Sequence, residues 1–136
     1  MKSFSLFRLL LLLVFTAAAT ACKKDSDSAT SLDGQWRLTE RQCYCPRTAV
    51  PDETVTFQGS SFAFYQNNRL VRRGTFSHVN TADLCGITSQ VPALRFVLDE
   101  ATPTTQTVGV HLDGNTLVLD YGSPCDAPRD TYQRME

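Results

Sequence analysis

From residue 32 onward, the chain consists of short segments in which apolar and polar residues alternate, separated by turn residues. This period of two is typical of strands with one buried face, and no segment shows a sustained helical period. Gly59-Ser60, Asn67-Asn68 and Asp113-Gly114 favour tight hairpin turns. A single helical turn is possible within residues 80–86. The pattern predicts strands at residues 35–41, 54–58, 61–66, 70–77, 93–98, 107–112, 115–121 and 131–134.

Eight short strands predict an all-β fold. Residues 32–136 are about 105 residues long, which is the size of one domain. Closing the sheet into a barrel removes its exposed edges. We therefore expect a small eight-stranded antiparallel up-and-down barrel, with a two-sheet sandwich as the alternative.

The first 31 residues read as a targeting segment. Lys2 and Arg8 precede an apolar run at residues 9–15 and small residues at 17–21, which predicts a signal peptide over residues 1–21. The run is too short for a transmembrane helix. Cys22 follows the small residues and resembles the lipidated cysteine of the bacterial lipobox. Because Ala19-Thr20-Ala21 also fits ordinary signal peptidase, a secreted protein with a free cysteine is the alternative.

Residues 22–31 are then the lipidated cysteine and a disordered tether, because residues 23–31 are small, polar and charged. The expected partner is the lipid bilayer, reached through the acyl chains on Cys22. The protein is expected to be exported and anchored to the bacterial cell envelope. Whether it sits on the periplasmic or the surface face of the outer membrane stays open.

With Cys22 assigned to lipid, four cysteines remain: Cys43, Cys45, Cys85 and Cys125. An even number in an oxidising compartment predicts two disulfides, with three possible connectivities. Cys43 and Cys45 are two residues apart, near the upper limit for bridging in an extended strand, so each is expected to bond to Cys85 or Cys125. In a simple barrel Cys85 falls at the opposite end, so residues 79–92 would have to fold along the wall. A redox or metal site at residues 43–46 is a weaker alternative.

No residue pattern favours an enzyme, a metal site or a cofactor. The only histidines are His78 and His111; His111 is expected to face solvent, and no nucleophile motif accompanies either. The adjacent acids at residues 52–53 and 99–100 suit turns and solvation. From residue 32 onward nine Arg, no Lys and twelve acidic residues give a formal charge of 9 − 12 = −3, which disfavours a nucleic-acid partner.

The inward faces of the strands offer a better candidate site. If the barrel is wide enough, the apolar residues in the core-facing phase line a cavity; if it is narrow, they fill it as a packed core. Arg72 is in phase with Leu70 and Phe76 unless Gly74 bulges, and an arginine there could bind a ligand carboxylate. A solvent-facing or salt-bridged arginine is the alternative. The candidate lining residues are Trp36, Phe57, Phe62, Phe64, Arg72, Phe76, Phe96 and Tyr121.

Two motifs resemble those of a known superfamily. The segment Leu32-Asp33-Gly34-Gln35-Trp36-Arg37-Leu38 resembles the opening Gly-x-Trp strand of the lipocalins and calycins, and Tyr132-Gln133-Arg134 resembles their last strand. The chain from Leu32 to Glu136 is similar to small lipocalin-like domains of bacterial lipoproteins. It lacks the Thr-Asp-Tyr loop motif and a C-terminal helix. The resemblance implies that Arg134 packs across the Trp36 ring at one closed end, and that a small apolar ligand is bound.

Two functions are consistent with these features. The first is a membrane-anchored lipocalin-like domain that binds a small apolar or amphipathic ligand. The second is a cell-envelope module for protein–protein interaction or inhibition, with a filled barrel and no ligand. Its candidate surface is the rim formed by residues 43–53 and 122–130.

Overall fold

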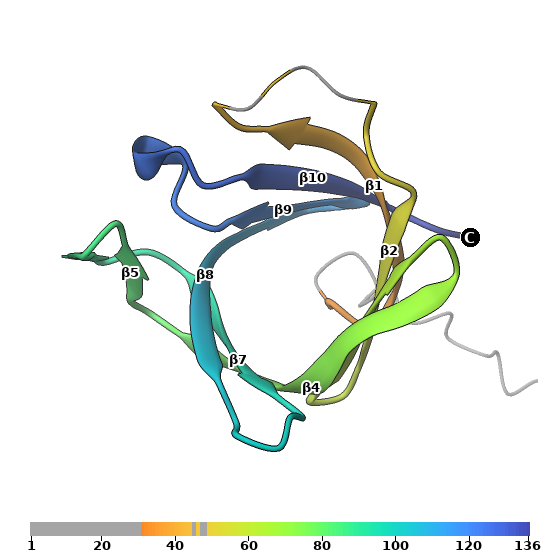
Figure 1. The fold of residues 1–136 in the computed structure, drawn as a ribbon, viewed down its shortest axis with the longest axis horizontal. Helices are drawn as coiled ribbons and strands as arrows, with labels where there is room; N and C mark the ends of the chain where they lie inside the picture. The colour runs from red at the N-terminus through yellow and green to blue at the C-terminus, as the bar shows by residue number, and fades with distance from the viewer. Residues whose placement is uncertain (1–30, 45, 47–48) are drawn as a thin grey trace, which may run out of the picture.

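The computed structural model describes residues 31–44, 46 and 49–136. Eight strands form a closed antiparallel barrel, in which β1 pairs with both β10 and β2, so every strand of the sheet has two neighbours (Figure 1). Strands that are consecutive in the sequence are neighbours around the barrel. The predicted up-and-down barrel is therefore confirmed, and the sandwich alternative is wrong. The barrel strands are β1 (Gly34–Gln42), β2 (Glu53–Gln58), β3 (Ser61–Gln66), β4 (Arg69–Val79), β7 (Ala93–Leu98), β8 (Thr105–Asp113), β9 (Thr116–Asp120) and β10 (Arg129–Arg134).

All eight predicted strands are present, but the connection between β4 and β7 differs from the prediction. The helical turn expected within residues 80–86 is wrong. The segment instead forms a second, two-stranded sheet of β5 (Ala82–Leu84) and β6 (Ile87–Ser89). Cys85 and Gly86 make its turn with positive φ angles of 66° and 72°. β5 packs against β8 outside the barrel wall.

The disulfide follows from this hairpin. Cys85 bonds to Cys125, which ends the short 3₁₀ helix η2 (Ser123–Cys125). The expectation that Cys43 and Cys45 bond to these two cysteines is therefore wrong. The physical reason is that residues 79–92 do fold along the wall, and this brings Cys85 to Cys125. Cys45 lies outside the described residues, so a second disulfide stays a prediction.

The core is built by the alternation of the strands. Inward side chains from every barrel strand are buried, and an aromatic cluster fills the middle of the barrel. Phe96 lies at its centre, with ring centroids 4.6 Å from Phe62, 6.2 Å from Phe64, 6.4 Å from Phe57 and 6.5 Å from Phe76. The Phe62 and Phe64 rings meet Phe96 edge to face, and such pairs stabilise a core beyond their buried area. In the middle of the barrel, the packed-core alternative describes the arrangement.

Two register shifts decide which charged residues face inward. One shift in the pairing of β1 with β10 lies between Leu38 and Glu40, and Arg41 after it is half-buried opposite Asp130. The other lies in β4, where Phe64 pairs with Arg72 but Tyr65 pairs with Leu70. The predicted shared phase of Leu70 and Arg72 is therefore wrong, because Val71 is the extra residue. Leu70 is 48% exposed, whereas Arg72 is half-buried.

The predicted signal peptide, Cys22 and nearly all of the predicted tether lie outside the described residues. Within the described part of the chain, no helix is both long and apolar enough to cross a membrane.

Candidate functional site

The predicted site residues do not form one site; they are distributed along the barrel axis. We call the end where β1 begins and β10 finishes the tryptophan end, because Trp36 and Arg134 lie there. The opposite end, where β1 finishes and β4 begins, is the Arg72 end. The four phenylalanines around Phe96 lie between the two ends as packed core.

At the tryptophan end, Trp36 and Arg134 make the contact that the resemblance implied. The Arg134 guanidinium carbon lies 4.1 Å from the Trp36 ring centroid, and the ring is fully buried. Trp36 Nε1 donates to the Leu32 carbonyl at 2.8 Å, and Arg134 Nη1 donates to the Asp33 carbonyl at 2.6 Å. Such a cation–π contact contributes about 0.5 to 2 kcal/mol.

Gly34 makes this contact possible. Its φ angle is +127°, and a Cβ added there would lie 2.8 Å from Arg134 Nη1. Only glycine combines that backbone conformation with space for the guanidinium. The Gly-x-Trp spacing therefore has a local physical cause in this chain.

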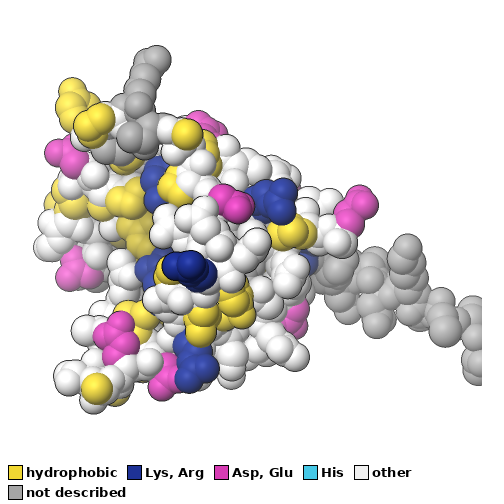
Figure 2. Space-filling view, turned by 45° about the vertical axis from the view of Figure 1, so that its right-hand side comes forward, with side chains coloured by type: hydrophobic (Ala, Val, Ile, Leu, Met, Phe, Trp, Pro, Cys, Tyr) yellow, Lys and Arg dark blue, Asp and Glu magenta, His cyan; other side chains and the backbone are white. Residues whose placement is uncertain are grey.

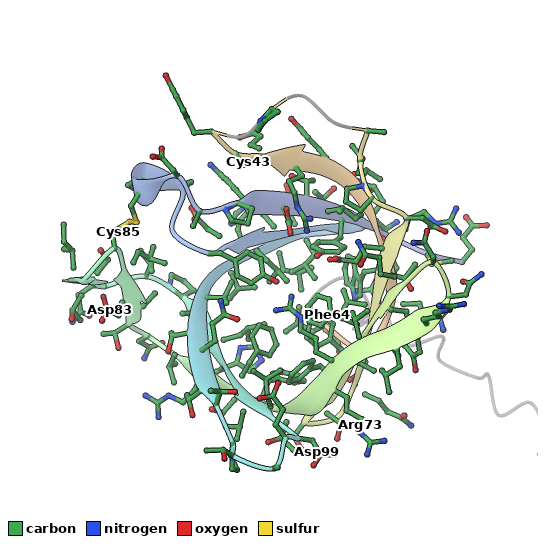
Figure 3. The ribbon with its side chains drawn as sticks, in the orientation of Figure 1. Cys43, Phe64, Arg73, Asp83, Cys85 and Asp99 are labelled. Carbon is green, nitrogen blue, oxygen red and sulfur yellow. A yellow bond between two sulfur atoms is a disulfide. The ribbon has the colours of Figure 1, made fainter. Side chains whose placement is uncertain are left out.

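At the Arg72 end, the guanidinium of Arg72 projects into the barrel. Its carbon lies 3.9 Å from the Phe64 ring centroid, and Phe64 points to the barrel interior in Figure 3. Nη2 donates to the Tyr121 hydroxyl at 2.8 Å. Among the residues that the structure describes, no Asp or Glu pairs with Arg72. The alternative of a salt-bridged arginine therefore does not fit the described contacts.

Tyr121 stays protonated beside this cation. Burial raises the pKa of Tyr121 to about 12, although the neighbouring Arg72 charge acts in the opposite direction. Because its oxygen accepts from Arg72, its own O–H proton is left to donate to another acceptor. Arg72 and Tyr121 can thus present N–H and O–H donors to one acidic group.

An ionic network lies beside these two residues and was not predicted. Arg41 holds buried Asp130 through two bonds, Nε to Oδ1 at 2.7 Å and Nη2 to Oδ2 at 2.6 Å. Tyr132 donates to Glu53 at 2.6 Å, and Glu53 lies 3.6 Å from Arg41. The hydrogen bond to Asp130 raises the pKa of Arg41, and burial raises that of Tyr132. Arg41 is therefore already neutralised by carboxylates.

The remaining polar candidates lie on the surface. Asp99, of the second acidic pair, makes an exposed ion pair with Arg73 at 3.0 Å, outside the barrel wall in Figure 3. Charges of both signs are interspersed over the face that Figure 2 shows. Within the described ranges, no group of three or more His, Cys, Asp or Glu could hold a metal ion.

Comparison of the chain with family models, curated proteins and solved structures found no match. The functional inference therefore depends on the geometry of the barrel and its side chains.

Proposed function

We propose that this protein is a membrane-anchored, lipocalin-like domain that binds a small amphipathic molecule, with the ligand's acidic group held by Arg72. The single observation that carries this function is the guanidinium of Arg72 inside the barrel wall, which pairs with no Asp or Glu among the described residues. A half-buried cation without a carboxylate partner is costly unless a ligand or water satisfies it. A bound acid would relieve that cost.

The hydrogen-bonding capacity of Arg72 supports an acid as the ligand group. A guanidinium carries five N–H donors, and one described bond, to Tyr121, uses a single nitrogen. The fork geometry of arginine matches a carboxylate with two parallel bonds. Both parallel donors of Arg41, in contrast, are already bonded to Asp130, so of these two arginines Arg72 is the one left for a ligand.

The apolar part of the ligand has a surface beside Arg72. The rings of Phe64 and Tyr121 lie beside it, with centroids 3.9 Å and 5.6 Å from the Arg72 guanidinium carbon. Aromatic side chains are common in the lining of small-molecule sites. The middle of the barrel is packed, so the ligand is expected at the Arg72 end and not through the length of the lumen.

Membrane anchoring is the second part of the proposal. Acylated Cys22 would hold the protein at the cell envelope, and residues 23–31 would connect the lipid to the barrel. An extended chain spans at most about 3.6 Å per residue, so this tether would reach roughly 30 Å from the membrane. The ligands that the barrel meets are then those of the envelope.

One observation favours the alternative of a protein-binding module. Tyr44 is 92% exposed and Val50 is 45% exposed, and both lie on the predicted rim of residues 43–53. Exposed tyrosines are enriched in protein interfaces. In this alternative the filled barrel is a scaffold, and Arg72 has only a structural role.

Arg72→Gln separates the two functions. The full chain carrying Cys22→Ser, which removes any acyl chain, is titrated with decanoate in a calorimeter. We expect at least tenfold weaker binding for Arg72→Gln, and an unchanged affinity for the control Arg73→Gln, whose side chain points outside. Equal affinities for Arg72→Gln and the parent protein, with both folded, would contradict the role given to Arg72.

A further inference from the structure

A cavity opens at the tryptophan end, on the side of the barrel away from Arg72. Its volume is about 610 Å³, which is within the range of small-molecule pockets. Apart from exposed Pro92, its apolar side chains are buried or half-buried, and both histidines of the chain lie on it. The lining residues used below are Leu32, Phe76, His78, Val110, His111 and Leu112.

The cavity exists because the barrel wall is incomplete there. The pairing of β7 with β8 ends at Ala93 and Gly109, and one further bond joins the Val110 N–H to the Pro92 carbonyl. The pairing of β8 with β9 continues to Asp113. The last residues of β8 thus have no described strand partner on their β7 side. The chain between β4 and β7 has left the wall to form the β5–β6 hairpin.

The opening exposes the inner face of the barrel. Phe76, Val110 and Leu112 belong to the core or pack against it, yet they also line the cavity. The Phe76 ring lies 5.9 Å from the His78 ring, which stands at the mouth. The cavity therefore offers an apolar floor with polar groups at its rim.

The polar groups of this rim differ in charge from those at the Arg72 end. Among the described residues that line the cavity there is no Arg or Lys, and Asp33 is the one with a formal charge when His is counted as neutral. Asp33 Oδ1 accepts from the Gly59 N–H at 2.8 Å. Its Oδ2 has no hydrogen bond within the described part of the chain. A carboxylate oxygen that lines the same cavity as two imidazoles favours a donor and disfavours an anion.

We propose that this cavity is a second binding site, for a small apolar molecule with an amine or hydroxyl head group. The apolar body packs on Phe76, Val110 and Leu112. The head group donates to Asp33 or to an imidazole at the rim. Because Arg72 takes no part, this site is independent of the function proposed above.

A pair of dyes that differ by one sulfonate tests the site. N-phenyl-1-naphthylamine is uncharged, and 8-anilino-1-naphthalenesulfonate is its anionic analogue; both fluoresce more strongly in apolar surroundings. In the full chain carrying Cys22→Ser and Arg72→Gln, we expect the uncharged dye to bind at least tenfold more tightly than the sulfonate. Equal or tighter binding of the sulfonate would overturn the proposal.

Two tryptophan substitutions locate the dye. His78→Trp fills the mouth from an exposed position and should weaken binding of the uncharged dye at least tenfold. Ser77→Trp is the matched control, because Ser77 is also exposed, is adjacent on β4, and does not line the cavity. Unchanged affinity in a folded His78→Trp variant would overturn the proposal.

Imidazole NMR signals give a readout that needs no mutation at the site. The chain has two histidines, so only two imidazole spin systems are observed. Both should shift when the uncharged dye binds, and neither should shift with decanoate. If decanoate fails to bind while the dye shifts both signals, the Arg72 function fails and this site stands. If the dye binds without shifting them, this site fails.

Discussion

Arg72 and Arg73 are adjacent, yet they have opposite environments. Arg73 is on the outer face and pairs with Asp99, and both side chains are more than half exposed. Such a pair adds little to stability. Arg72 is on the inner face, over the Phe64 ring and bonded to Tyr121. Alternation along β4 therefore separates a surface charge from a candidate ligand-binding charge.

Tyrosine ionisation gives a prediction at the residue scale. Burial raises the pKa of Tyr121 to about 12 and also raises that of Tyr132. The unfolded chain releases these protons near pH 10, so it binds fewer protons than the folded state above that pH. The contribution of the two tyrosines to the free energy of unfolding is therefore complete below pH 10. Between pH 10 and 12 it falls by roughly 1.4 kcal/mol per pH unit for each buried tyrosine.

Urea unfolding at pH 9, 10 and 11 measures this effect. The Tyr121→Phe variant should show a smaller loss over the same interval, because one of the two groups is gone. An unfolding free energy that stays constant from pH 9 to 11 would show that the tyrosines are not buried as described.

At the residue scale, the sequence predicted the contacts of side chains that belong to short motifs. The Gly-x-Trp segment and its relation to Arg134 came from short motifs, and the structure shows Arg134 over the Trp36 ring. The Arg41–Asp130 pair was missed, because a register shift in β1 turns Arg41 inward and nothing in the local sequence marks it. Asp130 and Glu53 were read as turn or surface residues. Alternation of Asp130 with Tyr132 was the one usable signal.

Among the elements, the β5–β6 hairpin has the largest effect on shape. It lies outside the barrel, and the disulfide between Cys85 and Cys125 attaches its turn to η2 (Figure 3). The hairpin was not predicted because its strands are only three residues long and show no clear alternation. Long strands with repeated alternation, in contrast, were located to within a few residues.

Removal of this disulfide should release the hairpin and leave the barrel intact. The Cys85→Ser, Cys125→Ser double variant is expected to lose about 2 to 4 kcal/mol of stability, since the bridge closes a loop of 40 residues. Amide hydrogen exchange should accelerate at residues 82–89. The strands around Phe96 should keep their protection. Faster exchange throughout the barrel, or no change at the hairpin, would contradict this separation of the two sheets.

For the whole molecule, barrel closure was predictable because eight alternating strands leave few ways to bury their apolar faces. Three features could not be predicted: the register shifts, the hairpin and the cavity beside β8. Each depends on contacts between segments that are distant in sequence. The described chain begins at Ser31, next to Arg134, whose Nη2 donates to the Ser31 carbonyl. The proposed lipid tether therefore joins the barrel at its tryptophan end, and the Arg72 end lies opposite.

Lipidation can be checked on the intact protein. Mass spectrometry of the mature chain should show that it starts at Cys22 and carries a diacylglycerol, with or without a third acyl chain. The protein should partition into detergent, and Cys22→Ser should transfer it to the aqueous phase. An unmodified Cys22 in a water-soluble parent protein would exclude the anchor and leave the barrel as a secreted domain.

The most direct measurement is a crystal structure of the Cys22→Ser protein with decanoate bound. The predicted result is a carboxylate within hydrogen-bond distance of the Arg72 guanidinium and the Tyr121 hydroxyl, with the alkyl chain against the Phe64 and Tyr121 rings. A carboxylate bound at another place in the barrel, or decanoate absent at saturating concentration while Arg72 keeps its present contacts, would contradict the proposed function.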